Sequence, residues 1–177
     1  MDRIPFLAST ASEAYGEIRE LPVSVLLDNV RSMYNVGSFF RTADAAGVRK
    51  LYLCGITAHP PKGGIHKTAL GAENSVDWEY HRDAAAILDE LRLQDGEIAA
   101  IETSPHAVDL FDWAPRYPLC VVFGHEVEGV QRGLLEKADT FVRIPMLGGK
   151  HSLNVATAGG VVLFELLRKY RFWSRCH

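Results

Sequence analysis

The sequence predicts an α/β protein with a mostly parallel sheet that is covered by helices on both faces. Short apolar segments alternate with helix-like segments along the chain, which is typical of parallel sheets. The apolar segments also lack the polar alternation of a half-exposed strand, as residues 119–123 (LCVVF) illustrate. We expect residues 1–177 to form a single domain, because a chain of this length can bury one large core.

The first expected elements are a short helix, a strand, a longer helix and a second strand. The helix at 10–20 is short and polar, and the strand at 23–27 (VSVLL) is largely apolar. The helix at 36–46 is followed by Gly47, a residue that commonly ends helices, and then by the strand at 50–54 (KLYLC).

The middle of the chain is expected to begin with a loop. Two prolines and three glycines at 55–64 argue against regular structure there, so we expect an exposed loop. A helical turn at 68–73 and a short strand at 78–80 follow. An amphipathic helix at 83–93 and a strand at 98–101 complete this part.

The last part ends in an unusually apolar helix. After an irregular stretch, the strand at 119–123 is followed by a helix at 130–138 and a strand at 141–144. The final helix, 154–171, is apolar over more than one face. Either a partner subunit covers the second face, or the helix is buried wholly within one subunit.

The composition is that of a soluble globular protein and excludes several classes. Hydrophobic residues make up 47% of the chain and charged residues 23%. A net charge of −3 argues against a protein that coats nucleic acid non-specifically, so any contact with RNA must come from a local basic patch. No apolar run is long enough to cross a membrane and no signal-peptide pattern is present, which predicts a cytoplasmic protein without membrane contact.

The three cysteines, Cys54, Cys120 and Cys176, do not have the spacing of a metal site. Two of them lie in or at the end of apolar strands, where buried thiols are typical of proteins from a reducing compartment. We therefore expect neither a disulfide framework nor a metal.

Three stretches carry polar residues in positions suited to a site. In the first, Asn35 lies just before an expected helix, and Arg41 lies on that helix six residues later. This arrangement would present a carboxamide and a guanidinium together at a strand-to-helix loop. The alternative is structural, with Asn35 as a helix cap and Arg41 in solvent or in an ion pair.

The second stretch follows the strand at 119–123. Glu126 lies two residues after Gly124 and so at the carboxyl edge of the sheet, where open α/β sheets bind ligands. In the alternative, Glu126 and Glu128 occupy the first turn of the next helix and favour its dipole. His125 is interpreted as an exposed loop histidine.

The third stretch joins the strand at 141–144 to the final helix. The glycine pair Gly148–Gly149 gives a permissive bend, and Ser152 and Asn154 follow as residues that can cap a helix. Such a corner exposes backbone groups to a ligand. Ser152 lacks the G-x-S-x-G elbow of hydrolases, and the chain has neither a dinucleotide fingerprint nor a P-loop.

Together the three stretches resemble the ordered motifs of the TrmH/SpoU branch of the SPOUT RNA methyltransferases. The matching segments are NVGSFFRTADAAG, VVFGHEVEGV and RIPMLGGKHSLNVATA. The resemblance covers residues 23–168, and three motifs in order are far more specific than any one of them. It implies methyl transfer from S-adenosylmethionine to a ribose 2′-hydroxyl of RNA, either tRNA or rRNA.

The resemblance also implies a C-terminal trefoil knot, a rare exception to un-knotted topology. Segments that cross closely need residues without a Cβ, and we expect four glycines to supply them: Gly148, Gly149, Gly159 and Gly160. The cofactor would lie against backbone groups of the knot loops. By motif match, its residues are Thr103, Gly124, Ile144, Met146 and Leu153.

By the same resemblance, the catalytic residues are Asn35, Arg41, Glu126, Ser152 and Asn154. Family proposals make the arginine the general base, but a guanidinium with a pKa above about 12 is a poor base. Clamping a phosphate, or acting as an electrophile, is physically easier for Arg41. Ser152 and Asn154 would orient the hydroxyl and the cofactor. His125 and His151 adjoin the motifs as further candidates for the base.

The expected partners are RNA and a second copy of the chain, because family members dimerise through the C-terminal helix. In a dimer, Arg41 would act either within its own subunit or across the subunit interface. The basic and aromatic tail at 169–177 either contacts RNA or simply forms a helix end with cations. Other candidate RNA contacts are Lys62, His66, Lys67 and Arg82. A compact RNA feature, such as a loop, is the expected target.

Two alternatives to this function remain. One is a catalytically silent protein that binds RNA or cofactor on the same scaffold, although all five expected catalytic residues are present. The other is a methyltransferase with a different acceptor, such as a base nitrogen, although the motifs of base methylators differ from these.

Overall fold

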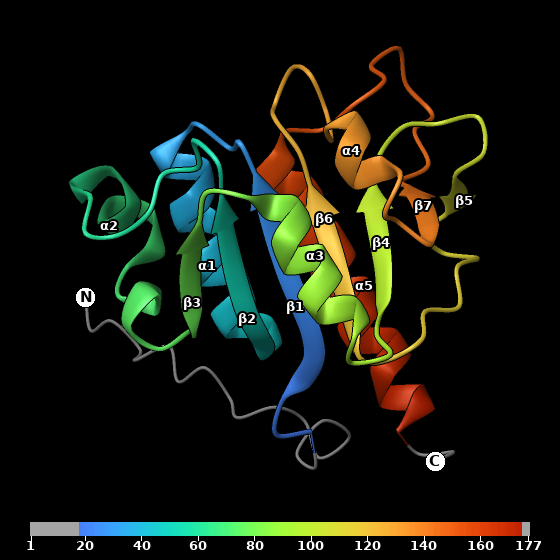
Figure 1. Cartoon of the computed structure of the whole chain (residues 1–177), viewed down its shortest axis with the longest axis horizontal. Coiled ribbons are helices and arrows are strands. Elements are labelled where there is room, and N and C mark those ends of the chain that lie inside the picture. Colours follow the sequence, from blue (N-terminus) through green and yellow to red (C-terminus); the bar gives the residue numbers. More distant parts are fainter. Residues whose placement is uncertain (1–17, 175–177) are drawn as a thin grey trace, which may run out of the picture.

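The computed structural model describes residues 18–174 and contains one parallel sheet between two helical layers (Figure 1). The seven strands have the order β3-β2-β1-β6-β4-β7-β5, and every paired neighbour is parallel. The strands are β1 (Leu21–Asp28), β2 (Val48–Cys54), β3 (Trp78–His81), β4 (Glu97–Ile101), β5 (Val108–Asp109), β6 (Leu119–Phe123) and β7 (Thr140–Arg143). All carboxyl ends of the strands therefore meet at one edge of the sheet, as the sequence predicted.

The helices divide between the two faces of the sheet. Helices α3 and α4 lie in front of the sheet in Figure 1, and α1 and α5 lie behind it. The helices are α1 (Met33–Ala46), α2 (Gly63–Ala69), α3 (Ala84–Arg92), α4 (Arg132–Leu135) and α5 (Val155–Trp173), with a 3-10 turn η1 (Ala72–Asn74). None of the helices within residues 18–174 is long and apolar enough to cross a membrane.

Each face of the sheet has its own hydrophobic cluster. The α1 and α5 side holds the larger one, in which the rings of Phe39 and Phe123 pack edge to face with centroids 5.1 Å apart. The α3 and α4 side holds a smaller cluster that includes Leu26, Leu88 and Val122. The alternation of strand side chains between the two clusters explains why the central strand β6, with the sequence LCVVF, is apolar throughout.

Helix α1 starts earlier than the sequence suggested. It begins at Met33, and the Ser32 hydroxyl caps it by accepting a hydrogen bond from the backbone N–H of Asn35 at 3.3 Å. Asn35 therefore lies in the first turn rather than before the helix, and it is not the cap. Its side chain is left available for contacts outside the helix.

Helix α2 lies partly in the stretch where a loop was expected. Ile65 and Ala69 are buried against α1, so tertiary contact outweighs the low helix propensity of the glycines. The close contact depends on Gly37 of α1, where an added Cβ would lie 2.4 Å from the carbonyl oxygen of Ile65. The sequence of residues 55–69 alone does not reveal this contact with α1, so it could not predict the whole of α2.

Three other expectations require correction. Helix α4 has only four residues instead of the nine expected at 130–138, and the short strand β5 lies in the stretch expected to be irregular. Most of the helix expected at 10–20 falls outside the described residues, and its last part, 18–20, is not helical.

Of the four glycines expected to permit close crossing of segments, one is seen to do so in the structure. A Cβ added at Gly159 would lie 2.3 Å from the ring of Phe39, so this glycine does permit a close approach of α5 to α1. Among residues 18–174, no neighbouring atom lies within 4 Å of a Cβ added at Gly148, Gly149 or Gly160, so those three are not needed for close crossing within this part of the subunit. The tightest backbone approach in this region lies instead at Gly124, whose added Cβ would lie 2.2 Å from the backbone of Gly129.

Candidate active site

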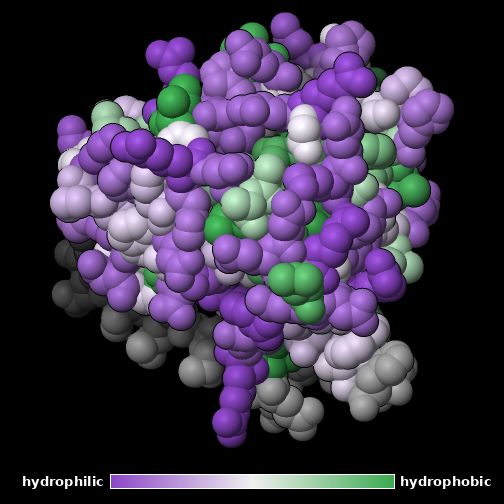
Figure 2. Space-filling model, viewed as in Figure 1, coloured by the Kyte–Doolittle hydropathy of each residue, from purple (hydrophilic) through white to green (hydrophobic). Residues whose placement is uncertain are grey.

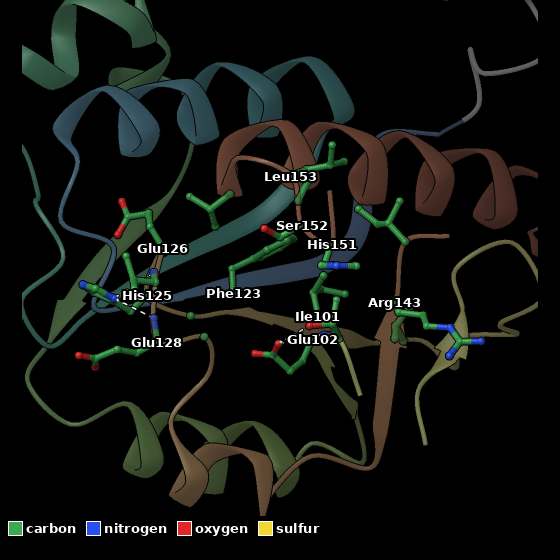
Figure 3. A pocket seen from close by; sticks show the side chains of 18 of the residues that line it. Ile101, Glu102, Phe123, His125, Glu126, Glu128, Arg143, His151, Ser152 and Leu153 are labelled. Atoms are coloured by element: carbon green, nitrogen blue, oxygen red, sulfur yellow. Dashed lines mark hydrogen bonds between the residues drawn. The ribbon is translucent and has the colours of Figure 1, made fainter. Parts of the chain in front are cut away.

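A cavity of about 340 Å³ opens at the carboxyl edge of the sheet, at the ends of β4, β6 and β7 and beside the first turn of α5. In Figure 3, Glu126 lies at one end of the cavity and Arg143 at the other. All five expected cofactor residues line it: Thr103, Gly124, Ile144, Met146 and Leu153. They come from three segments, which follow β4, β6 and β7 and which the parallel sheet brings to one edge.

The loop between β6 and α4 forms one wall of this cavity and is tightly built. His125 and Gly129 pair through two backbone hydrogen bonds, at 3.0 and 2.9 Å, and Gly129 has a φ of +74° that favours glycine. The ring Nδ1 of His125 accepts hydrogen bonds from the backbone N–H groups of Val127 and Glu128, both at 3.2 Å. His125 is therefore half-buried and holds the loop, rather than being an exposed loop histidine.

A carboxylate at the end of β4 fixes the same loop from the opposite side. Glu102 accepts a hydrogen bond from the backbone N–H of Val130 at 3.0 Å and another from the N–H of Thr103 at 2.9 Å. An added Cβ at Gly129 would lie 2.3 Å from the Glu102 carboxylate, which is a second reason for glycine there. The sequence reasoning missed Glu102, although its place directly after a buried strand was a usable signal.

The expected catalytic residues Asn35, Glu126 and Asn154 form a hydrogen-bonded chain. Asn35 donates from Nδ2 to Glu126 Oε1 at 3.0 Å, and Asn154 donates from Nδ2 to Asn35 Oδ1 at 3.2 Å. Asn154 also caps α5, because its Oδ1 accepts from the N–H groups of Ala156 and Thr157 at 2.9 and 3.3 Å. The chain fixes the orientation of both amides, and it joins α1, the β6 loop and α5.

Glu126 is held as a carboxylate. Burial raises its pKa, but hydrogen bonds from its own N–H, from Asn35 and from the N–H groups of Ser32 and Arg31 lower it by more, so that the pKa lies below its ordinary value. Helix α4 starts only at Arg132, so Glu126 does not occupy the first turn of that helix. The interpretation that Glu126 serves a helix dipole is therefore wrong.

Ser152 and Arg41 are less closely tied to this chain. Ser152 is exposed, lines the cavity and forms no hydrogen bond with another residue of the described range. Arg41 is exposed and has no hydrogen bond or ion pair with any residue among 18–174. Six residues along an α-helix correspond to a rotation of about 240°, so Arg41 does not share a face of α1 with Asn35. One subunit thus brings together four of the five expected catalytic residues.

The candidate RNA contacts are distributed over several surfaces. Lys169 is committed to the fold, because its Nζ donates to the carbonyl oxygen of Phe111 at 3.0 Å and lies 3.4 Å from Glu165. It is not available for RNA. Lys62, Lys67 and Arg82 are exposed and form no ion pair with a described residue, while His66 pairs with Glu73 at 2.5 Å. Residues 175–177 of the tail lie outside the described range.

Among residues 18–174, no group of three or more His, Cys, Asp or Glu side chains is arranged to hold a metal ion. Cys54 and Cys120 are buried without a disulfide, and burial raises the pKa of each thiol to about 12. Both are therefore inert parts of the core.

The family model and the relatives that match this chain all belong to RNA methyltransferases. A model of the SpoU rRNA methylase family matches residues 22–164. The chain is 33% identical over 151 residues to the 23S rRNA (guanosine-2′-O-)-methyltransferase RlmB of Vibrio parahaemolyticus, covering 85% of this chain and 60% of that protein. It is 31% identical over 154 residues to the tRNA (guanosine(18)-2′-O)-methyltransferase of Escherichia coli K12, covering 85% of this chain and 65% of that protein. The chain thus spans under two thirds of the length of these relatives.

Solved structures agree in fold. The A. aeolicus TrmH/SpoU tRNA modifying enzyme superposes with a TM-score of 0.79 at 30% identity, covering 88% of this chain and 79% of that one. The SpoU methyltransferase AviRb of Streptomyces viridochromogenes, solved in complex with AdoMet, gives a TM-score of 0.78 at 26% identity, covering 87% of this chain and 62% of that one.

Proposed function

Because the chain belongs to the SpoU rRNA methylase family, we propose that it methylates a ribose 2′-hydroxyl of tRNA or rRNA with S-adenosylmethionine as donor. One observation carries the proposal. The cavity lined by the five expected cofactor residues lies directly beside the hydrogen-bonded chain of Asn154, Asn35 and Glu126. A cofactor pocket and a fixed polar cluster at one sheet edge are what methyl transfer to a positioned hydroxyl requires.

The cavity suits S-adenosylmethionine in size and lining. Its volume lies at the lower end of the range of small-molecule sites, and apolar side chains such as Phe123, Val142 and Leu153 can cover an adenine ring. Carboxylates of Glu102, Glu126 and Glu128 also line it and favour a cationic ligand. When bound, the cofactor supplies a methyl group on a positively charged sulfur.

The polar cluster is suited to orienting the ribose. Glu126 is ionised and already accepts several hydrogen bonds, so we assign it to holding Asn35 rather than to removing a proton. The exposed hydroxyl of Ser152 and the amides of Asn35 and Asn154 can then fix the acceptor hydroxyl. Preorganised groups of this kind lower a barrier mainly by positioning, by about 7–11 kcal/mol at best.

We also propose a homodimer formed through α5. Val161 and Phe164 on this helix are 36% and 50% exposed, although both are apolar, and Leu153 beside its start is 37% exposed. Arg41 lacks a partner within residues 18–174, so the guanidinium would clamp a phosphate in the site of the other subunit. Figure 2 shows the opposite face, over α3 and α4, as mostly hydrophilic, which is unlike a subunit interface.

Three further properties belong to the same proposal. The segment after β7 is threaded as a trefoil knot, residues 1–177 form one domain, and the protein acts in the cytoplasm. The likeness to solved SpoU structures supports the knot. The single sheet that contains all seven described strands supports one domain, and the buried thiols support the cytoplasm.

The test is transfer of labelled methyl from S-adenosylmethionine to total RNA from cells that lack this protein. We expect label in one RNA species and a loss of at least 100-fold with Arg41→Ala or Asn35→Ala, while cofactor affinity measured by calorimetry stays within about threefold. Cofactor binding without labelling of RNA from any source would favour the silent-binder alternative and remove the role assigned to Arg41.

A further inference from the structure

A second hollow, of about 640 Å³, lies beside the first turn of α2, away from the cofactor cavity. Its lining combines the apolar Pro60, Pro61, Ile65 and Trp78 with Gly63 and with four polar or charged residues: Lys62, His66, Glu73 and Asn74. We call it the α2 hollow. None of its residues takes part in the methyl-transfer site described above.

Trp78 forms a fixed aromatic wall of the α2 hollow. Its ring packs edge to face on Phe40, with centroids 6.2 Å apart, and stacks with His59, with centroids 6.5 Å apart. Trp78 is nevertheless only half-buried. An indole ring that is held in place and still reachable is a surface on which a planar ring can stack at little entropic cost.

The charges around the α2 hollow favour an anionic ligand. Lys62 lines the hollow, and Lys67 lies outside its lining, further along α2. Both lysines are exposed and have no hydrogen bond or ion pair with a described residue. The carboxylate in the lining, Glu73, is engaged, since it pairs with His66 at 2.5 Å and accepts from the N–H of Gly71 at 3.0 Å. Two cations thus remain unneutralised in a chain whose net charge is −3.

The α2 hollow is connected to the proposed catalytic cluster. Gly64, in the first turn of α2, packs on Met33, and a Cβ added there would lie 2.9 Å from the Cβ of Met33. The Thr68 hydroxyl donates to the carbonyl oxygen of Tyr34 at 3.0 Å. Met33 and Tyr34 immediately precede Asn35, so both sites rest on the same segment of chain. Figure 1 shows α2 directly beside α1.

We propose that the α2 hollow seats an unpaired base of the RNA substrate, a near neighbour of the methylated nucleotide, with the base stacked on Trp78 and its flanking phosphates bound by Lys62 and Lys67. The proposal rests on the proposed function for the identity of the polymer. Proteins that bind single-stranded RNA combine such stacking faces with cations that follow the backbone. A base splayed into the hollow would restrict the substrate to loops or single strands, since a base inside a duplex cannot reach it.

The experiment measures binding of fluorescein-labelled RNA by anisotropy at several salt concentrations, with no methyl transfer involved. The probes are a hairpin with a seven-nucleotide loop and a blunt duplex of the same composition. We expect the hairpin to bind at least tenfold tighter than the duplex. Trp78→Ala should weaken hairpin binding about tenfold and Trp78→Phe, which keeps a ring, less than threefold.

The lysines are tested by the salt dependence of hairpin binding. The double variant Lys62→Ala, Lys67→Ala should reduce the slope of log affinity against log salt by about 1.4, which corresponds to two lost contacts with single-stranded phosphates. Arg132→Ala is the matched control. Arg132 is 92% exposed on α4, on the other face of the sheet, and its loss should leave the slope unchanged.

A spectroscopic signature separates stacking from a merely structural role of Trp78. Base stacking should quench part of the tryptophan fluorescence when unlabelled hairpin is added, and Trp78→Phe should abolish that part. Equal hairpin affinity in all Trp78 variants, or quenching of the same size in Trp78→Phe as in the wild type, would overturn the proposal. If the wild-type protein transfers methyl groups and the Trp78 variants bind the hairpin as tightly as it does, the proposed function stands and the hollow does not have this role. Specific hairpin binding that depends on Trp78, without any methyl transfer, would support the role of the hollow and contradict the proposed function.

Discussion

At the scale of single residues, the conspicuous exception to good polar pairing is Asp28, at the carboxyl end of β1. Its side chain is buried, with 3% exposure, and its Oδ2 atom has no hydrogen-bond partner among the described residues. Burial raises its pKa, and the hydrogen bond from Asn29 and the nearby His125 lower it by less. A carboxylate in this position destabilises the folded state at neutral pH.

Asp28→Asn is therefore expected to raise the free energy of unfolding at pH 7 by about 1 kcal/mol, because it removes a buried charge that lacks a partner. The folded-state pKa of Asp28 lies above the unfolded value, so acidification through the folded pKa protonates the wild-type carboxyl and removes its penalty. The gain should thus shrink as the pH falls. Urea unfolding of the wild type and the variant at pH 7 and at pH 4.5 measures the difference in the free energy of unfolding at each pH.

The matched control for this prediction is Asp83→Asn. Asp83 caps α3 by accepting from the N–H groups of Ala85 and Ala86, and asparagine caps a helix equally well. Its stability should stay within about 0.5 kcal/mol of wild type. A destabilised Asp28→Asn variant would contradict the account of Asp28.

Asn154 combines a structural and a proposed catalytic task that two substitutions can separate. Asn154→Asp keeps the oxygen that caps α5 but loses the N–H donated to Asn35. We expect unchanged stability and a loss of methyl transfer of more than tenfold. Asn154→Ala should lose methyl transfer as well and also about 1 kcal/mol of stability, the usual value of an N-cap. Thermal unfolding and initial rates give both numbers.

The sequence indicated which residues would meet at this edge of the sheet better than it indicated their geometry. Glycines and polar residues after apolar strands marked the cavity, since parallel strands end at one edge. The pairing of Asn35 with Glu126 was not foreseeable, because the two residues are far apart in the sequence and Asn35 was placed outside the helix. Glu102 was missed although it directly follows a buried strand, because its bond from the N–H of Val130 joins residues that are far apart in the sequence.

At the scale of elements, the packing of α5 on α1 depends on one glycine. Gly159→Ala should destabilise the protein by about 1–3 kcal/mol, because the added methyl would lie 2.3 Å from the ring of Phe39 in a packed core. Gly160→Ala, one residue later, meets no atom of residues 18–174 within 4 Å, so within one subunit it should instead stabilise the helix by up to about 1 kcal/mol. Chemical denaturation of the two variants compares them directly.

The elements that the sequence predicted well are those whose signal is local. The strands at 23–27, 50–54 and 119–123 are all present, because continuous apolar runs between turn residues are sufficient to define them. Helix α2 was predicted only at its end, within the helical turn expected at 68–73, since its stability comes from Ile65 and Ala69 packing on α1 rather than from its own sequence.

At the scale of the whole molecule, the proposed dimer predicts that each active site is shared. Phe164→Glu should convert the dimer into a monomer and abolish methyl transfer, because it buries a charge in the interface and separates Arg41 from its site. Analytical ultracentrifugation beside the activity assay tests this. A monomeric wild-type protein with full activity would refute the shared site.

Mixing two inactive variants tests the sharing itself. In a heterodimer of Arg41→Ala and Asn35→Ala subunits, one of the two sites contains both intact residues. Random exchange should therefore restore about a quarter of the wild-type activity. If Arg41 acted within its own subunit, the mixture would stay inactive.

The central claim is that the acceptor is a ribose 2′-hydroxyl, and the position of the transferred methyl tests it most directly. RNA labelled by the wild-type protein would be hydrolysed with alkali, which cannot cleave next to a 2′-O-methylated ribose. We predict that the label is recovered in an alkali-resistant dinucleotide and remains with the ribose after the base is removed. Label recovered on free bases, or in ordinary mononucleotides, would contradict the claim.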